Sequence, residues 1–261
     1  MKIPGPIIIN ADDFGYNTET NKAIIDAFEK RLSSSTTIMA NMPGFEEACD
    51  LIHERGLLHH TGIHLVITEG TPLTNQIMRS RRFCNSQGAF NLTRQNRIFR
   101  LQTSEKALLA RELREQIKKC RRNKIPITHA DSHKNIHEEW AIAKIVMKIC
   151  KEEQVSWVRL ARNCGKWRTR YNRAYRHILN FRLKTAGMTR TRYFGSAIDC
   201  KYFFERNRIT AKTTSIEVMT HPAYKKSSLV DTILKVELAK SIKSIGYNGK
   251  IVSYTGHTWE G

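Results

Sequence analysis

The stretch that decides the fold is PIIINADDFG, residues 6–15. Its β-branched apolar run is typical of a buried strand, and the run ends in two acids, Asp12 and Asp13. Comparable runs alternate with helical patterns along the chain, which predicts strands at 6–11, 36–40, 61–67, 125–130, 156–160, 213–219 and 250–254. This alternation is typical of βαβ units around a parallel sheet, and about seven or eight such units close most naturally into a barrel. We therefore predict one α/β domain, residues 1–261, with a (β/α) barrel-like (TIM-barrel-like) fold.

Segments between the predicted strands show a helical period. Residues 17–31 place apolar side chains at helical spacing, with Asn17 as the predicted cap, and residues 104–122 repeat the pattern. Residues 70–103 carry neither the helical nor the strand period. A structureless insertion of this length in a compact domain is usually functional or mobile, so we expect it to pass over the barrel mouth.

The composition indicates a globular protein with an unusual charge. Of 261 residues, 40% are hydrophobic, which provides enough apolar surface for a sizeable core. Lys and Arg number 44 against 24 Asp and Glu, so the formal net charge is +20. This balance suits polyanions, anionic membrane surfaces or acidic substrates without choosing among them. Six cysteines without a CxxC pair exclude a zinc ribbon and a redox motif.

The sequence also bears on location. The longest apolar run is far shorter than the roughly 18 residues that a membrane-spanning helix needs. Pro4, Gly5 and Pro6 interrupt the apolar opening, so we expect no secretory leader and a cytoplasmic location. Peripheral association with the inner face of a membrane is an open alternative, because of the positive charge.

Acids and histidines stand at or near the ends of several predicted strands. They are Asp12, Asp13, His64, Asp131, His133 and His221. In a parallel β/α barrel the carboxyl ends of the strands meet at one rim, so these groups are expected to converge there. Because buried carboxylates and imidazoles need compensation, the convergence predicts a divalent cation site. Asp12 and Asp13 are adjacent on a strand and should point to opposite faces, with different partners.

Four motifs in this order resemble those of the YdjC/ChbG family of carbohydrate deacetylases. They are NADDFG at 10–15, GIHL at 62–65, DSH at 131–133 with His137 after it, and EVMTHP at 217–222. The similarity runs from residue 6 to about residue 255. The resemblance implies a barrel-like β/α fold and one divalent metal held by Asp13, His64 and His133. The family more often has a further histidine where Lys134 and Asn135 stand, which affects substrate preference rather than metal binding.

The predicted ligand set suits Mg²⁺, Zn²⁺, Mn²⁺ or Co²⁺, with Mg²⁺ or Zn²⁺ preferred, and leaves coordination positions open for catalysis. The predicted enzyme is a metal-dependent hydrolase that removes the acetyl group of an N-acetylated sugar, with activated water as nucleophile. The sugar is either an oligosaccharide or a lipid-linked or phosphorylated sugar. Asp12 is the candidate general base and His221 the candidate general acid. A metal phosphoesterase is an alternative, although such enzymes usually gather more carboxylates. A non-catalytic or anionic-surface-binding protein on the same scaffold is another.

Other polar residues receive weaker assignments. Asp131 is placed to accept the second imidazole N–H of a ligand histidine and is also a candidate for substrate contact. His137 is expected to line the pocket or to cap the following helix. Arg159 is either a substrate contact or a surface residue, and Glu217 is a further candidate for substrate binding.

Much of the excess positive charge lies in a basic segment, about 154–198, which contains no acid. It carries Arg159, Arg162, Lys166, Arg168, Arg170, Arg173, Arg176, Arg182, Lys184, Arg190 and Arg192. Within it an apolar stripe stands at helical spacing: Trp167, Tyr171, Tyr175, Ile178 and Leu179. The stripe either packs into the barrel, lies on an anionic membrane surface, or covers the mouth and holds a phosphorylated or lipid-linked sugar. Nucleic acid is a lower-ranked partner because no recognition motif accompanies the charge, and a homodimer stays open.

Overall fold

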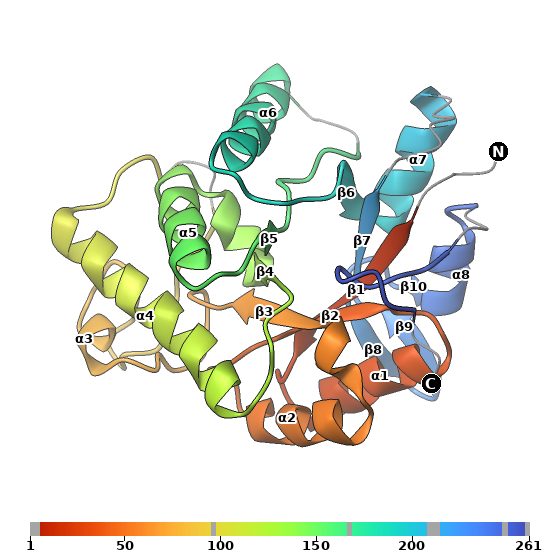
Figure 1. Ribbon diagram of the computed structural model, residues 1–261, viewed down its shortest axis with the longest axis horizontal. Helices are drawn as coiled ribbons and strands as arrows, with labels where there is room; N and C mark the ends of the chain where they lie inside the picture. Colours follow the sequence, from red (N-terminus) through yellow and green to blue (C-terminus); the bar gives the residue numbers. More distant parts are fainter. Residues whose placement is uncertain (1–5, 95–97, 166–168, 208–214, 247–249, 259–261) are drawn as a thin grey trace.

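The computed structural model of the chain describes residues 6–94, 98–165, 169–207, 215–246 and 250–258. Seven strands form one sheet in the order β5-β4-β3-β2-β1-β7-β6, and every pairing within it is parallel. They are β1 (Ile7–Phe14), β2 (Ser35–Ile38), β3 (Thr61–Leu65), β4 (His129–Ser132), β5 (Trp157–Val158), β6 (Tyr193–Ser196) and β7 (Ile216–Thr220). The sheet is the inner layer of a single-domain, barrel-like α/β fold (Figure 1).

Helices cover the outside of this sheet (Figure 1). They are α1 (Thr18–Glu29), α2 (Phe45–Glu54), α3 (Asn75–Met78), α4 (Thr103–Arg122), α5 (Trp140–Glu152), α6 (Arg170–Thr185), α7 (Ala197–Asn207) and α8 (Leu238–Lys243), with the short 3₁₀ helices η1 (Leu57–His60) and η2 (His133–Glu138). The predicted cap of the first helix is confirmed, because the side chain of Asn17 accepts a hydrogen bond from the backbone N–H of Thr20. No helix within the described residues is long and apolar enough to cross a bilayer.

The core lies between the sheet and the helices. Phe14 from β1 and Phe28 from α1 are almost fully buried in the largest apolar cluster. Toward β7, Ile7 and Ile9 pack with residues of β7 and α7 in a second cluster. β1 and β7 are apolar over most of their length, whereas β2 and β4 consist largely of polar residues.

The barrel has an open side between its edge strands, β5 and β6. A single bridge, from Trp157 to Thr189, joins β5 to the chain just before β6. Helix α6 stands over this side (Figure 1). The basic segment therefore supplies the wall that closes the barrel.

Several predicted elements differ from the structure. The strand predicted at 250–254 is reduced to one bridge between Ile251 and Ile7. The strand predicted at 125–130 starts only at His129, because the apolar part of that run precedes the sheet and the strand itself carries polar residues. The sequence did not predict β6, nor a small antiparallel sheet of β8 (Pro222–Lys225), β9 (Ser228–Asp231) and β10 (Val236–Glu237).

Candidate active site

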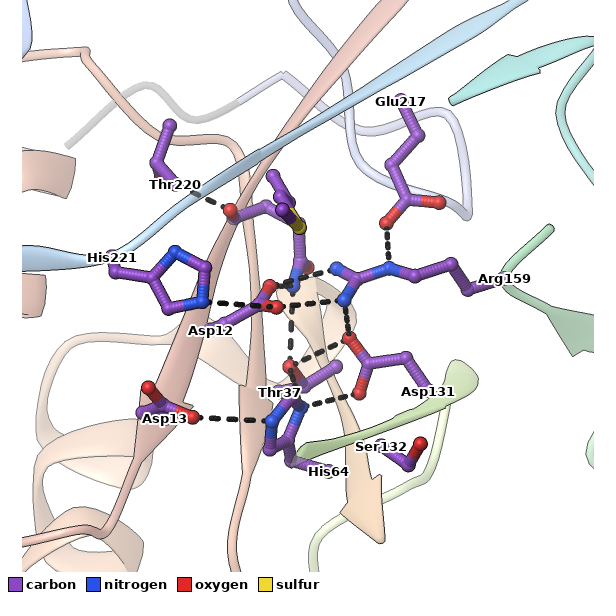
Figure 2. A network of polar contacts seen from close by, with 12 residues as sticks. Asp12, Asp13, Thr37, His64, Asp131, Ser132, Arg159, Glu217, Thr220 and His221 are labelled. Atoms are coloured by element: carbon purple, nitrogen blue, oxygen red, sulfur yellow. Dashed lines mark hydrogen bonds and ion pairs between the residues drawn. The ribbon is translucent and has the colours of Figure 1, made fainter. Parts of the chain in front are cut away.

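The end of strand β1 is bent so that both of its acids face one centre (Figure 2). The register with β2 shifts between Ala11 and Phe14, and Asp13 adopts a left-handed backbone with φ of 73°. The prediction that Asp12 and Asp13 point to opposite faces is wrong, because strict alternation ends at this irregularity. Their partners nevertheless differ. Asp13 meets His64, whereas Asp12 meets Arg159.

Polar side chains of β4 and β2 contact the ring of His64. Its Nδ1 lies 2.6 Å from Oδ1 of Asp131, the residue opposite it in the β3–β4 register. The hydroxyl of Thr37 lies 3.1 Å from the same nitrogen and 3.2 Å from Oδ2 of Asp131. Because the carboxylate accepts the Nδ1 proton, Nε2 of His64 is directed toward Asp13, 3.1 Å from its Oδ1. Burial disfavours a charged imidazole, but Asp131 and Asp13 outweigh it and raise the pKa of His64 to about 10.

Arg159 is the centre of the buried charge network (Figure 2). It follows β5 and is 1% exposed, so the interpretation as a surface residue is wrong. Its two terminal nitrogens donate to the two oxygens of Asp12, each at 2.7 Å. It also contacts Asp131 Oδ2 at 2.6 Å and donates from Nε to Glu217. Burial opposes ionisation of Asp12, but Arg159 holds the pKa of that carboxyl well below its usual range.

His133 lies across the rim from His64, with the ring centroids 5.9 Å apart. Its Nδ1 lies 2.6 Å from the hydroxyl of Thr68 and 3.1 Å from Oε1 of Glu69, both on the loop after β3. Burial lowers the pKa of His133 to about 4, partly offset by Asp13. The imidazole is therefore neutral at neutral pH, the form that binds metal ions.

His221 approaches the same centre from the residue after β7. Its Nε2 lies 3.7 Å from Oδ2 of Asp12, and its side chain is 17% exposed. The backbone N–H of His221 donates to Asp231 at the end of β9, which fixes the turn into the small sheet. His221 thus stands beside Asp12 where the network reaches solvent.

Two buried atoms at this rim fit a cation. Asp13 Oδ1 and His64 Nε2 lie 3.1 Å apart, and neither has another partner among the described residues. Because the pKa of His64 is raised to about 10, the Nε2 proton of the charged imidazole lies between them. A divalent ion can displace this proton, and the two atoms then offer it a carboxylate oxygen and an imidazole lone pair. Together with His133, whose ring centroid lies 5.9 Å from that of His64, the donors would be one carboxylate and two imidazoles, the set that Zn²⁺ and related ions accept with positions left open.

Asp12, His64 and Asp131 form a second compact group, at which a bound cation is less favourable. One ligand atom each from Asp12, His64 and Asp131 lie within 4.8 Å of one another. Arg159 already donates to both oxygens of Asp12 and contacts Asp131, so the guanidinium supplies the positive charge there. A metal ion between these carboxylates would lie against a fixed cation, which disfavours it electrostatically.

The weaker site predictions lie deeper in the fold. His137 is buried, with Nδ1 2.6 Å from the hydroxyl of Ser132. Glu217 is fully buried against Arg159, and burial raises its pKa to about 7 despite that guanidinium. His129 is also buried, stacked on Tyr254 with centroids 3.7 Å apart. Substrate contact by His137, Arg159 and Glu217 stays a prediction. In the structure, His137 contacts Ser132, and Arg159 and Glu217 contact each other.

Sequence reasoning missed the neutral residues that orient the network. Asn10 donates to Asp12 Oδ1 at 2.8 Å and to Thr37 at 3.2 Å, so it joins β1 to β2 beneath the site. Thr68 and Glu69, which orient His133, were missed as well. For Asn10 the available signal was a polar residue inside the apolar strand β1, because a buried polar side chain requires a partner.

Comparisons with known proteins bear on the family and the fold of the chain. The sequence profile of the family described as YdjC-like protein matches residues 6–246. A carbohydrate deacetylase from Brevibacillus brevis is 30% identical over 254 residues, covering 94% of this chain and 96% of the relative. Another from Halalkalibacterium halodurans is 27% identical over 230 residues, covering 88% and 87%.

A solved structure has the same fold. It is a protein described as a cellobiose-phosphate cleavage protein, from Enterococcus faecalis, with a TM-score of 0.68 and 19% identity, covering 97% of this chain and 98% of the other. At this identity the likeness bears on the fold alone. The family profile matches almost the entire chain, and the Brevibacillus relative aligns along nearly its full length. The chain belongs to the YdjC-like protein family.

Proposed function

We propose that this chain is a metal-dependent hydrolase that removes the acetyl group from an N-acetylated sugar. The family relatives named carbohydrate deacetylase support the reaction class. Metal dependence is supported by one observation above all: Asp13 Oδ1 and His64 Nε2 are buried 3.1 Å apart, with no other partner among the described residues.

Asp13, His64 and His133 would hold the ion, with Mg²⁺ or Zn²⁺ as the preferred candidates. When bound, the ion supplies Lewis acidity, which polarises the amide carbonyl and lowers the pKa of a water molecule. Asp131 supports this role at the other ring nitrogen of His64, because it accepts the Nδ1 proton and keeps Nε2 available. Thr68 and Glu69 orient His133 in the same way.

Asp12 and His221 would carry the proton transfers. Arg159 keeps Asp12 ionised, so this carboxylate can take the proton of the attacking water. The hydroxyl adds to the acetyl carbon, the C–N bond then breaks, and its electron pair stays on nitrogen. His221, 3.7 Å from Asp12 and nearer to solvent, would donate a proton to the departing amine. The products are acetate and a free amino sugar.

The substrates that we propose are short N-acetylglucosamine oligomers or a lipid-linked N-acetyl sugar. A cytoplasmic location, association with an anionic membrane surface and a homodimer also stay proposals. They rest on the composition and the basic segment.

The test is mass spectrometry of candidate sugars incubated with chelator-treated and then metal-reconstituted protein. Metal-assisted hydrolysis of the acetamide predicts a loss of about 42 Da, one acetyl replaced by hydrogen, only after reconstitution. Asp12→Asn protein loaded with the same metal is the matched control and should give no loss. Unchanged sugars with every divalent ion would overturn the proposal. Phosphate release from p-nitrophenyl phosphate without acetate release would favour the phosphoesterase alternative.

A further inference from the structure

A cavity of about 370 Å³ lies on the open side of the barrel. Its walls come from α6, from the chain after β5 and from the chain before β6 and β7. Its lining includes the cationic residues Lys184, Arg190 and Arg192 together with His177, and no carboxylate among the described residues. None of the proposed metal ligands or proton-transfer residues lines it, so the cavity is separate from the candidate active site.

The walls of the cavity are fixed by two asparagines. Asn180 of α6 pairs with the backbone of Ala161 through both ends of its amide, each contact at 2.8 Å. Asn163 accepts from the backbone N–H of Phe194 at 2.8 Å and donates to the carbonyl of Arg192 at 2.9 Å. Helix α6, the chain after β5 and the chain at β6 are thereby joined around the cavity. The space is preformed, and the amide groups are already used for structure.

The cations of the cavity differ from other arginines of the same segment. Arg162 pairs with Asp199, and Arg176 pairs with Glu138. For Lys184 and Arg190 the described part of the chain provides no acidic partner, and the sequence has no acid between Glu153 and Asp199. Like charges gathered around one cavity without a counter-charge repel one another, and an anion relieves the repulsion.

We propose that this cavity binds the phosphate group of an organic phosphate ester. Lys184, Arg190 and Arg192 would donate charge-assisted hydrogen bonds to the phosphate oxygens. The volume exceeds the needs of a bare ion, and the ring of Phe181, 58% exposed, adds an apolar wall for the organic part of the ligand. The ester is either a soluble sugar phosphate or the headgroup of an anionic lipid.

The experiment measures binding of three probes to the full chain. Inorganic phosphate and glucose 6-phosphate are titrated calorimetrically, and phosphatidylcholine vesicles with and without phosphatidylglycerol are tested by flotation. The double variant Lys184→Ala/Arg190→Ala is compared with Lys118→Ala/Lys144→Ala, which removes the same charge from exposed positions on α4 and α5. We expect the cavity variant to bind at least about tenfold more weakly and the control variant to bind like the unmodified chain.

The single variant Lys184→Gln removes one charge from an exposed side chain, and it keeps the test decisive if the double variant does not fold. It should weaken the binding of whichever probe binds, by less than the double variant. Binding of glucose 6-phosphate identifies a soluble ester, and binding of only the phosphatidylglycerol vesicles identifies a lipid headgroup. The proposal is overturned if no probe binds, or if the cavity and control variants bind alike. None of these readouts depends on deacetylation, so the two proposals can fail separately.

Discussion

Arg159 donates to Asp12 through both terminal nitrogens, Nη1 to Oδ2 and Nη2 to Oδ1, at 2.7 Å each. The contact joins the carboxyl ends of β1 and β5, which are 147 residues apart in sequence at these positions. A planar guanidinium that matches both oxygens fixes the carboxylate in position as well as in charge. The same side chain contacts Asp131 and Glu217, so one cation sets the geometry of three buried acids.

Arg159→Met should destabilise the protein by about 3–5 kcal/mol, because removing one partner leaves buried charges uncompensated. The free energy of urea unfolding measures this loss. Arg162→Met is the matched control. Its ion pair with Asp199 is partly exposed to solvent, so the expected loss is below about 1 kcal/mol. Equal losses in the two variants would contradict the assignment of Arg159 as the centre of the network.

Asp13→Ala and His64→Ala should each lose bound metal, since each removes one of the two atoms that we propose as ligands. Asp12→Asn should keep the metal but lose turnover by about 10²–10⁴-fold, the usual contribution of a positioned general base. Metal content by mass spectrometry and acetate release measure the two effects. Metal loss from Asp12→Asn protein would show that the division of roles between the adjacent acids is wrong.

Asp131→Asn tests the contact between Asp131 and Nδ1 of His64. The amide oxygen can still accept the Nδ1 proton, but the negative charge that favours this arrangement is gone. Metal affinity should fall by about 10–100-fold, as for other partners of ligand histidines, with the fold preserved. Competition with a chromogenic chelator measures the affinity, and circular dichroism reports the fold. An unchanged affinity would remove Asp131 from the site.

Glu138 should make the protein sensitive to acid. Burial opposes its ionisation, but Arg94 and Arg176 outweigh it and lower the pKa of Glu138 below its ordinary value of 4.5. The unfolded chain therefore takes up this proton first, so stability is present above pH 4.5 and is lost as pH falls below it. Unfolding free energies between about pH 3 and 6 should show a shallower acid slope for Glu138→Gln. Glu29→Gln, in a solvent-exposed pair with Arg55, should leave the slope unchanged.

The sequence predicted the fold class and six of the strands of the main sheet because their apolar runs are also the core. It failed at β6, where Tyr193–Ser196 follows a basic stretch and contains a glycine instead of a β-branched run. It also extended 250–254 into a strand, although only Ile251 bridges to β1. Strand pattern reports burial, whereas pairing depends on neighbours far away in sequence. The stripe residue Trp167 lies outside the described residues.

At the site, spacing and motif order brought the expected acids and histidines to one rim. What sequence could not provide was the partner of each group. The sequence around Arg159 is compatible with an exposed or a buried side chain. The structure shows that it is buried, because three carboxylates pack around it. The bend at Asp13 was equally hidden, because strand alternation predicts the opposite orientation.

That bend restricts which amino acids position 13 can accept. Its backbone lies in the left-handed region, with φ of 73°, which aspartate and asparagine tolerate better than most non-glycine residues. Asparagine would preserve the turn but lack the anionic oxygen, and glutamate would retain the anion at the expense of a strained turn and a longer reach. The backbone conformation and the proposed metal ligation thus place two separate requirements on position 13, and aspartate meets both where asparagine and glutamate each meet one.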